Sequence, residues 1–374
     1  MDLNTPPRIG IFVATSGHSG VDRVMNNLIP GIAARGYPVD LLKIRDHGPY
    51  LDPLPPGVRL VDLGAHHVYT ALPALIHYLR TTSPSVLLSD KDRVNRTTLL
   101  ARALSGASTR VVVRSGTTLS VDLARRSALD RWLQSRSVRH LYPRAHGTIV
   151  PSTGAAVDLA RLMPRGADLI HVVPSPIVRE DLPALASAPA QDPWLETAKG
   201  PLIVAVGELS PRKDHAMLLR AFARLKVRRP ELRLAILGRG GQRDDLLRQI
   251  TELGLEGAVH LPGFLSNPYS WMARACLLAH TAHWEGMPVV LVESLSLGIP
   301  VVSTDCPSGP REILADGRLG PLVPVGDDET MAAAMDRVLD NPPDPQELRR
   351  AAEPYRVDRS VSAYLEAMGL TDDR

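Results

Sequence analysis

The sequence of 374 residues is poor in cysteine and has no long apolar run. Its two cysteines, Cys276 and Cys306, stand in no C-x-x-C or Cys/His pattern, which argues against a zinc site. We interpret them as buried, reduced thiols. No stretch reaches the roughly 18 uninterrupted apolar residues of a membrane span, and the N-terminal segment lacks the basic region of a signal peptide. We therefore expect a cytoplasmic chain.

Aromatic residues account for only 4% of the chain, and glutamate is absent from residues 1–176. That half holds 21 Lys and Arg against 12 Asp, a net charge of +9, whereas the remaining residues carry a net −6. The asymmetry indicates an anionic partner for the first half, such as a membrane surface, a lipid phosphate or a nucleic acid. Nucleic acid is the least favoured, because no recognised motif and few stacking side chains accompany the charge.

The length suits two domains of about 150 to 200 residues each. In both halves, short β-rich runs alternate with amphipathic stretches, which predicts an α/β protein with two Rossmann-like, doubly wound parallel-sheet domains. We expect these domains at 1–176 and 197–352, a proline- and alanine-rich linker at 177–196, and a C-terminal helix in 353–374 that packs back across the domains. The expected strands are 8–14, 38–44, 58–63, 85–89, 109–114, 147–150, 201–207, 232–238, 258–264, 276–281 and 299–304.

Several expected strands run directly into glycine, as at Gly207 and Gly238. Ligands of open α/β sheets bind beyond the carboxyl ends of the strands, so we expect loops of both domains to line one central cleft. The loop after the first strand contains Gly20, which permits close approach of the backbone to a phosphate or sugar. This loop does not match the G-x-G-x-x-G pattern of dinucleotide-binding proteins.

The most informative segment is 283–314. Glu285 precedes a Gly-x-Pro turn in which Pro288 is well placed to open a helix. The N–H groups of Val289 and Val290 at that helix start predict an anion site for a diphosphate. Glu293 would lie about 7 Å further along the helix, where its carboxylate can accept hydrogen bonds from ribose hydroxyls. The spacing alone also fits a glutamate on the solvated side of a surface helix.

A second segment, 204–222, ends a strand at Gly207 and brings Arg212 and Lys213 to the front of a helix. Two cations at this end oppose the helix dipole, so they predict an anionic partner. The phosphates of a departing nucleotide diphosphate are the natural candidate. As an isolated pair, the two residues also fit a solvated surface.

Together these segments resemble the retaining, GT-B-fold glycosyltransferases of the glycosyltransferase group 1 (family 4) type, over nearly the whole chain. Glu285 and Glu293 match the family's E-x7-E pattern. G-E-L-S-P-R-K at 207–213 matches its G-R-L-x-x-x-K loop, and S-G-V-D-R at 19–23 matches its G-G-x-E-R. The resemblance implies that Glu285 contacts the donor sugar, Glu293 the ribose and Lys213 the diphosphate, with the loop at 263–267 nearest the base.

The motifs and the resemblance define the expected site. Its catalytic residues are Glu285, Lys213 and Arg212. No cofactor is expected, because the nucleotide sugar is a co-substrate. No metal is expected either, because these cations supply the positive charge. The sequence Asp90-Lys91-Asp92 fits the D-x-D motif of metal-dependent transferases only superficially. The expected donor-binding residues are Gly20, Gly207, Gly238, Gly263, Asn267, Gly286, Met287, Pro288, Val289, Val290 and Glu293.

Two positions depart from the family pattern. Glu208 stands where the G-R-L loop has its arginine, so half of the diphosphate clamp is missing unless Arg212 replaces it. The histidine that many relatives carry falls near Ser115 or Gly116 here, which leaves His18 as a candidate substitute.

Residues 122–144 combine leucines and a tryptophan with Arg125, Arg126, Arg131, Arg136, Arg139 and Arg144. A basic amphipathic helix can lie on an anionic membrane surface or face a lipid-phosphate acceptor. It can also be an ordinary packed helix with a solvated basic side.

The sequence thus predicts a metal-independent hexosyltransferase that moves a sugar from a UDP- or GDP-sugar to a saccharide or lipid-linked saccharide hydroxyl with retention. We expect it to act in cell-surface polysaccharide or glycolipid synthesis, at the inner face of the membrane and without nucleic acid. Two alternatives stay open: an epimerase or phosphorylase on the same fold, and a non-catalytic nucleotide-sugar-binding subunit.

Overall fold

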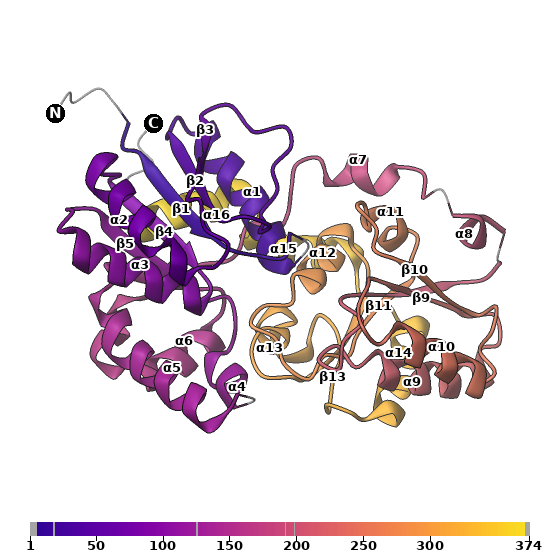
Figure 1. Cartoon of the computed structure of the whole chain (residues 1–374). Helices are drawn as coiled ribbons and strands as arrows, with labels where there is room; N and C mark the ends of the chain where they lie inside the picture. The colour runs from indigo at the N-terminus through magenta and orange to yellow at the C-terminus, as the bar shows by residue number, and fades with distance from the viewer. Residues whose placement is uncertain (1–5, 18, 125, 191, 198, 371–374) are drawn as a thin grey trace. The chain divides into compact units, whose positions relative to one another are not determined.

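The computed structural model describes residues 6–17, 19–124, 126–190, 192–197 and 199–370 (Figure 1). The chain forms two compact units. Unit 1 comprises Met1–Ile177 and Tyr355–Arg374, and unit 2 comprises Val178–Pro354. The C-terminal segment therefore belongs with the N-terminal half of the sequence.

Unit 1 is built on a seven-stranded sheet in the order β3-β2-β1-β4-β5-β6-β7, in which each neighbouring pair is parallel. Valine, leucine and isoleucine dominate these strands because helices cover both faces of a parallel sheet. The strand order reverses between β1 and β4, which creates a topological switch point. The strands are β1 (Ile9–Val13), β2 (Val39–Lys43), β3 (Val58–Asp62), β4 (Val86–Asp90), β5 (Arg110–Arg114), β6 (Gly147–Val150) and β7 (Ile170–Val172).

Helices connect these strands. The first begins with a capping box, in which Ser19 and Asp22 satisfy each other's backbone N–H groups. The helices of unit 1 are α1 (Gly20–Ala34), α2 (Leu72–Thr81), α3 (Asp92–Ser105), α4 (Leu119–Ala124), α5 (Ala128–Leu141), α6 (Thr153–Leu162) and α16 (Val357–Ala367), with 3-10 turns η1 (Tyr69–Ala71), η2 (Tyr142–Arg144) and η3 (Pro164–Leu169).

The C-terminal helix α16 is tied into unit 1 by close packing and a buried hydrogen bond. It packs on α1 at Gly31, where a Cβ would come within 2.6 Å of Val361 Cγ2. Arg114 Nε donates to the Tyr364 hydroxyl at 2.8 Å and Arg114 Nη1 to Asp90 Oδ2 at 2.5 Å. The arginine at the end of β5 thus joins two strands and α16.

Unit 2 repeats the design with six parallel strands in the order β10-β9-β8-β11-β12-β13. Its strands are β8 (Leu202–Val206), β9 (Arg233–Leu237), β10 (Val259–Gly263), β11 (Leu277–His280), β12 (Val301–Thr304) and β13 (Leu322–Val323). Its helices include α9 (His215–Arg228), α10 (Arg243–Glu252), α11 (Tyr269–Met272), α12 (Val289–Leu297), α13 (Pro310–Ile313), α14 (Asp328–Asp340) and α15 (Pro345–Ala352).

The stretch that we predict to be a linker carries two short helices, α7 (Leu182–Ser187) and α8 (Pro193–Thr197), and is grouped with unit 2. Trp194 stacks on His260 with ring centroids 5.0 Å apart. Asn267 Nδ2 donates to the Leu185 carbonyl at 2.8 Å. These contacts hold the stretch on unit 2, although its sequence shows little helical periodicity.

The glycines that end β8 and β9 allow a very close backbone approach. A Cβ on Gly238 would lie 1.8 Å from the Gly207 carbonyl oxygen, and one on Gly240 would lie 2.3 Å from the Leu209 carbonyl oxygen. Gly238 is therefore required by packing whether or not a ligand contacts it.

Candidate active site

Three loops at the carboxyl edge of the unit 2 sheet are bonded together. Thr281 Oγ1 donates to the Lys213 carbonyl at 2.7 Å, which joins the loop after β11 to the loop after β8. Thr304 Oγ1, at the end of β12, donates to the Ala282 carbonyl at 2.6 Å. A Cβ on Gly309 would come within 2.5 Å of Pro288 Cδ, so the loop after β12 presses on the start of α12. The loops are thus held by packing and hydrogen bonds.

Glu285 is the centre of this arrangement. Its Oε1 atom lies 2.5 Å from Lys213 Nζ and its Oε2 atom 2.9 Å from Arg212 Nη1. The Glu285 side chain is 8% exposed, that of Lys213 11% and that of Arg212 32%, so the lysine contact is the more shielded. Burial alone would raise the pKa of Glu285, but the cations Lys213 and Arg212 hold that pKa well below its usual value. Glu285 is therefore a carboxylate with two cationic partners.

Glu293 lies on α12 and is buried, with 2% of its surface exposed. Its Oε1 atom accepts a hydrogen bond from the Tyr269 hydroxyl at 2.8 Å. This burial rules out the surface-helix interpretation of its spacing. An acidic side chain inside an apolar helix requires polar partners, and Tyr269 supplies one of them.

Pro288 is the N-cap of α12, and the helix begins at Val289. The helix therefore starts one residue later than the sequence predicts, because Pro288 was expected to lie in its first turn. Pro288 makes no side-chain capping hydrogen bond. The start of α12 directly follows the Glu285-Gly286-Met287 loop, so its N-terminal turn lies next in sequence to the two-cation cluster. Gly286 and Met287 are both buried.

The remaining expected donor residues are distributed unevenly. Gly207 lies under the Lys213 side chain, because a Cβ there would come within 3.1 Å of Lys213 Cε. Gly263 ends β10, and its carbonyl accepts from Gly238 N at 2.8 Å. Asn267 uses its amide on the Leu185 carbonyl, and its Oδ1 accepts from Tyr269 N at 3.2 Å, so its side chain is already engaged. Gly20 lies in unit 1, at the start of α1.

Two side chains of this cluster, His280 and Tyr269, are absent from the site that the sequence predicts. His280 is the last residue of β11, 3% exposed, with its Nε2 atom 3.6 Å from Glu285 Oε1. Tyr269 opens α11 and reaches Glu293. His280 could have been predicted as a site residue, because a histidine ends an otherwise apolar strand close in sequence to a motif glutamate. Nothing in the sequence indicates that Tyr269 pairs with Glu293.

The positions that depart from the family pattern lie in both units. Glu208 is exposed, while Arg212 bonds to Glu285. Ser115 is buried, and a Cβ on Gly116 would come within 2.8 Å of Arg114 Nη1, so arginine occupies the space beside this turn. His18 and Arg125 lie outside the described residues.

Asp90, in the D-x-D-like sequence, bonds to Arg114, and its Oδ1 accepts from Lys91 N at 2.7 Å. Asp92 pairs with Arg96 at 2.9 Å. In the described part of the chain, no three His, Cys, Asp or Glu side chains gather as a metal-binding group.

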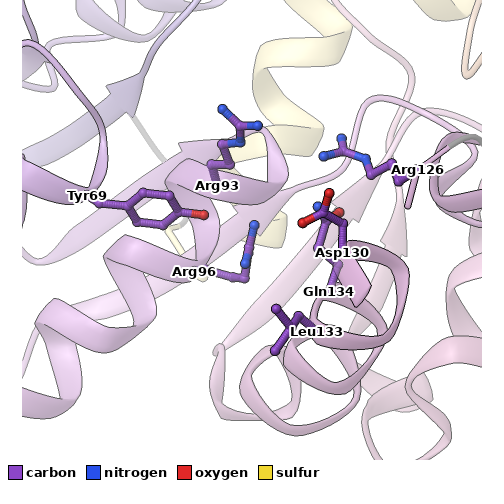
Figure 2. A pocket seen from close by; sticks show the side chains of 7 residues that line it. All are labelled: Tyr69, Arg93, Arg96, Arg126, Asp130, Leu133 and Gln134. Atoms are coloured by element: carbon purple, nitrogen blue, oxygen red, sulfur yellow. The ribbon is translucent and has the colours of Figure 1, made fainter. Parts of the chain in front are cut away.

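Unit 1 has an arginine-lined cavity of about 350 Å³ between the starts of α3 and α5. Figure 2 shows Arg93 and Arg96 of α3 on one side and Arg126, with Asp130 and Gln134 of α5, on the other. Arg126 Nη2 is 2.7 Å from Asp122 Oδ2. Three arginines and one aspartate line the space, and two of these arginines also pair with aspartates outside it, Arg96 with Asp92 and Arg126 with Asp122.

A second cavity of about 500 Å³ lies at the other end of α5, lined by Trp132, Arg136, Arg139, His140 and Arg165. Arg136 stacks over the Trp132 ring at 5.2 Å. On the same helix Leu129, Trp132 and Leu133 are exposed by 66%, 55% and 48%. Leu123, Val138 and Tyr142 are buried in the core of unit 1, so this segment packs on unit 1 through one side and exposes a second set of apolar side chains. None of the helices in the described ranges has the length and apolar character needed to cross a bilayer.

The two parallel sheets define a class of protein, the GT-B fold. Anabaena HepE, solved in complex with UDP, superposes with a TM-score of 0.80 at 19% identity and covers 97% of this chain and 99% of that chain. A sucrose-phosphate synthase from Thermosynechococcus elongatus gives a TM-score of 0.74 at 17% identity, covering 96% of each chain.

The chain belongs to the glycosyltransferase group 1 family. The family model "Glycosyl transferases group 1" matches residues 190–354, and "Glycosyl transferase 4-like domain" matches 19–176. A Campylobacter jejuni N-acetylgalactosamine-N,N'-diacetylbacillosaminyl-diphospho-undecaprenol 4-alpha-N-acetylgalactosaminyltransferase is 30% identical over 89% of this chain and 90% of its own length. A phosphatidyl-myo-inositol mannosyltransferase of Mycolicibacterium smegmatis is 32% identical over 50% of this chain and 48% of its own. The protein is thus a glycosyltransferase, as the sequence motifs predict.

Proposed function

We propose that this glycosyltransferase moves a sugar from a nucleotide-diphosphate sugar to an acceptor hydroxyl with retention of anomeric configuration. The observation that carries the proposal is the buried Glu285, bonded to Lys213 and Arg212 just ahead of the N-terminal turn of α12. Two cations and a helix N-terminus favour negative charge. A departing nucleotide diphosphate supplies it.

In this proposal the diphosphate takes over Lys213 and Arg212, while the N–H groups of Val289 and Val290 bind its oxygens. These donors stabilise the charge that develops as the bond to the anomeric carbon breaks. They also supply the positive charge that a divalent metal would otherwise provide, so we propose metal-independent transfer. Glu293 accepts hydrogen bonds from the ribose, with Tyr269 fixing its orientation.

The donor is proposed to be a UDP- or GDP-sugar. HepE was solved with UDP, and with UDP-glucose in a further structure, at the same fold. Glu293 would recognise a ribose in either nucleotide, and we therefore place no preference on the base.

The acceptor is proposed to be a saccharide carried on a lipid phosphate, at the inner face of a membrane, in cell-surface glycan or glycolipid synthesis. The C. jejuni relative is named for a diphospho-undecaprenol substrate. In unit 1 the arginine-lined cavity of Arg93, Arg96 and Arg126 suits an anionic group. The exposed leucines, tryptophan and arginines of α5 suit an anionic lipid surface.

The test is a calorimetric screen of UDP-, GDP- and ADP-sugars with and without Mg²⁺, followed by NMR of the product with a lipid-linked acceptor. We expect one nucleotide class to bind without metal, and an α-linked product from an α-linked donor. A rearranged nucleotide sugar formed without acceptor would point to an epimerase instead. Binding without turnover would favour a non-catalytic subunit.

A further inference from the structure

The buried ring of His280 has one nitrogen engaged and one unused. His280 Nδ1 lies 2.9 Å from Ser303 Oγ, and Ser303 Oγ in turn lies 2.9 Å from the Thr304 carbonyl. A carbonyl only accepts, so the Ser303 hydroxyl proton is directed to Thr304. Ser303 Oγ then accepts from His280, which places the imidazole proton on Nδ1.

This tautomer leaves the Nε2 lone pair next to a carboxylate. Nε2 is 3.6 Å from Glu285 Oε1, beyond hydrogen-bond length, and it has no hydrogen-bond partner among the described residues. Two acceptors facing each other without a proton repel, which explains the separation. A single added proton on Nε2 would convert the contact into an ion-paired hydrogen bond.

The charges around His280 explain why that proton is absent before the donor binds. Burial lowers the pKa of His280, and Lys213 and Arg212 act in the same direction. His215, at the start of α9, is also neutral because burial lowers its pKa to about 3. Glu285 raises the pKa of His280, but Lys213 and Arg212 already neutralise the charge of Glu285. The titratable and charged groups that act on the ring are Lys213, Arg212, His215 and Glu285.

We infer that donor binding is coupled to the uptake of one proton from solvent by His280 Nε2, which makes the imidazolium a replacement partner for Glu285. The inference rests on the proposed function: it requires the diphosphate to draw Lys213 and Arg212 away from Glu285. A buried carboxylate left without a counter-charge is strongly unfavourable. The nearest unused proton acceptor is His280 Nε2, so protonation there restores the ion pair while Nδ1 keeps its bond to Ser303. His280 is a positioning residue for Glu285.

The experiment is titration calorimetry of an intact UDP- or GDP-sugar in buffers of different ionisation enthalpy. An intact sugar donor is used because the terminal phosphate of a free nucleoside diphosphate itself titrates near about pH 6. We expect the full-length protein to take up close to one proton. The Kd should rise by up to about tenfold per pH unit through the window between the free and bound pKa values of His280.

The key variant is His280→Asn, whose amide can still donate to Ser303 but cannot titrate. Proton uptake should disappear in it while nucleotide binding remains measurable. The matched control is His283→Asn, because His283 lies three residues away and pairs with Asp214 at 3.1 Å. The His283→Asn variant should take up as many protons on donor binding as the unmodified protein.

The outcomes separate the two proposals. If no nucleotide sugar binds, the proposed function fails. If one binds to the unmodified protein with no net proton uptake and a Kd independent of pH, the His280 inference alone is overturned, whether or not the variant folds. Equal uptake by His280→Asn would also overturn it.

Discussion

Lys213 Nζ and Glu285 Oε1 lie 2.5 Å apart, although 72 residues separate them in the sequence. The contact pairs a lysine after β8 with a glutamate after β11, two adjacent parallel strands. Because both side chains are largely buried, removing Glu285 deprives Lys213 of a counter-charge, whereas removing Lys213 leaves Glu285 paired with Arg212. The proposed transfer depends on breaking and remaking this pair.

Replacing Lys213 should impair transfer more than binding of the acceptor. We expect Lys213→Ala to lower kcat/KM by about 10- to 100-fold, because a charge-assisted hydrogen bond contributes about 1.5 to 3 kcal/mol. Steady-state assays with the identified donor measure this. Lys199→Ala, which removes an exposed lysine of the same unit, is the control and should be neutral. A Lys213→Ala enzyme with unmodified kcat/KM would contradict the role assigned to the pair.

Removing the charge of Glu293 should weaken donor binding. Glu293→Gln is nearly isosteric and removes the charge, so we expect a Kd about tenfold or more higher, whereas Tyr269→Phe, which removes the hydroxyl that donates to Glu293 at 2.8 Å, should raise the Kd less. Calorimetric titration of the donor tests both. Glu231→Gln alters an exposed glutamate and serves as the control. Unchanged affinity in Glu293→Gln would remove Glu293 from the ribose site.

The Glu285 ion pairs should make the free energy of unfolding depend on pH. The folded-state pKa of Glu285 is lowered below its ordinary value of 4.5, so its contribution to the free energy of unfolding is fully present above about pH 4.5. This contribution is lost as the pH falls from there toward the lower folded-state pKa. Urea unfolding at several pH values between 3 and 7 should therefore show a shallower acid decline for Glu285→Gln than for the unmodified protein. Parallel profiles would mean that Glu285 does not keep its charge in the folded protein.

Reversing two charges on α5 should release the protein from anionic membranes. Each basic residue near such a surface contributes about 1 kcal/mol, so Arg136→Glu with Arg139→Glu should lower vesicle partitioning by at least about tenfold. Flotation with vesicles containing phosphatidylglycerol measures this, with pure phosphatidylcholine vesicles for comparison. A control reversing Arg161 and Arg248, both exposed elsewhere, should bind as before. Equal loss in the control would show a net-charge effect rather than a surface on α5.

The parallel sheets and the identity of the motif residues were readable from the sequence. Buried parallel strands require near-continuous apolar runs, and each expected run from 8–14 to 299–304 overlaps a strand, whereas the short strands β7 and β13 were not predicted. Glu285, Lys213 and Arg212 could be singled out because they match the E-x7-E and G-R-L-x-x-x-K patterns of the family, although the spacing of Arg212 and Lys213 alone also fits a solvated surface. The family resemblance added their roles, and the whole-length similarity to known transferases confirms the class.

The tertiary structure alone decided which side chains pair. The contacts of Glu285 with Lys213 and Arg212 depend on β8 and β11 being neighbours in the sheet, which no local pattern encodes. The same holds for Tyr269 with Glu293 and for His280 with Ser303. The burial of Glu293 and the exposure of Trp132 were equally unreadable, because a residue's type fixes its chemistry but only long-range packing fixes what surrounds it.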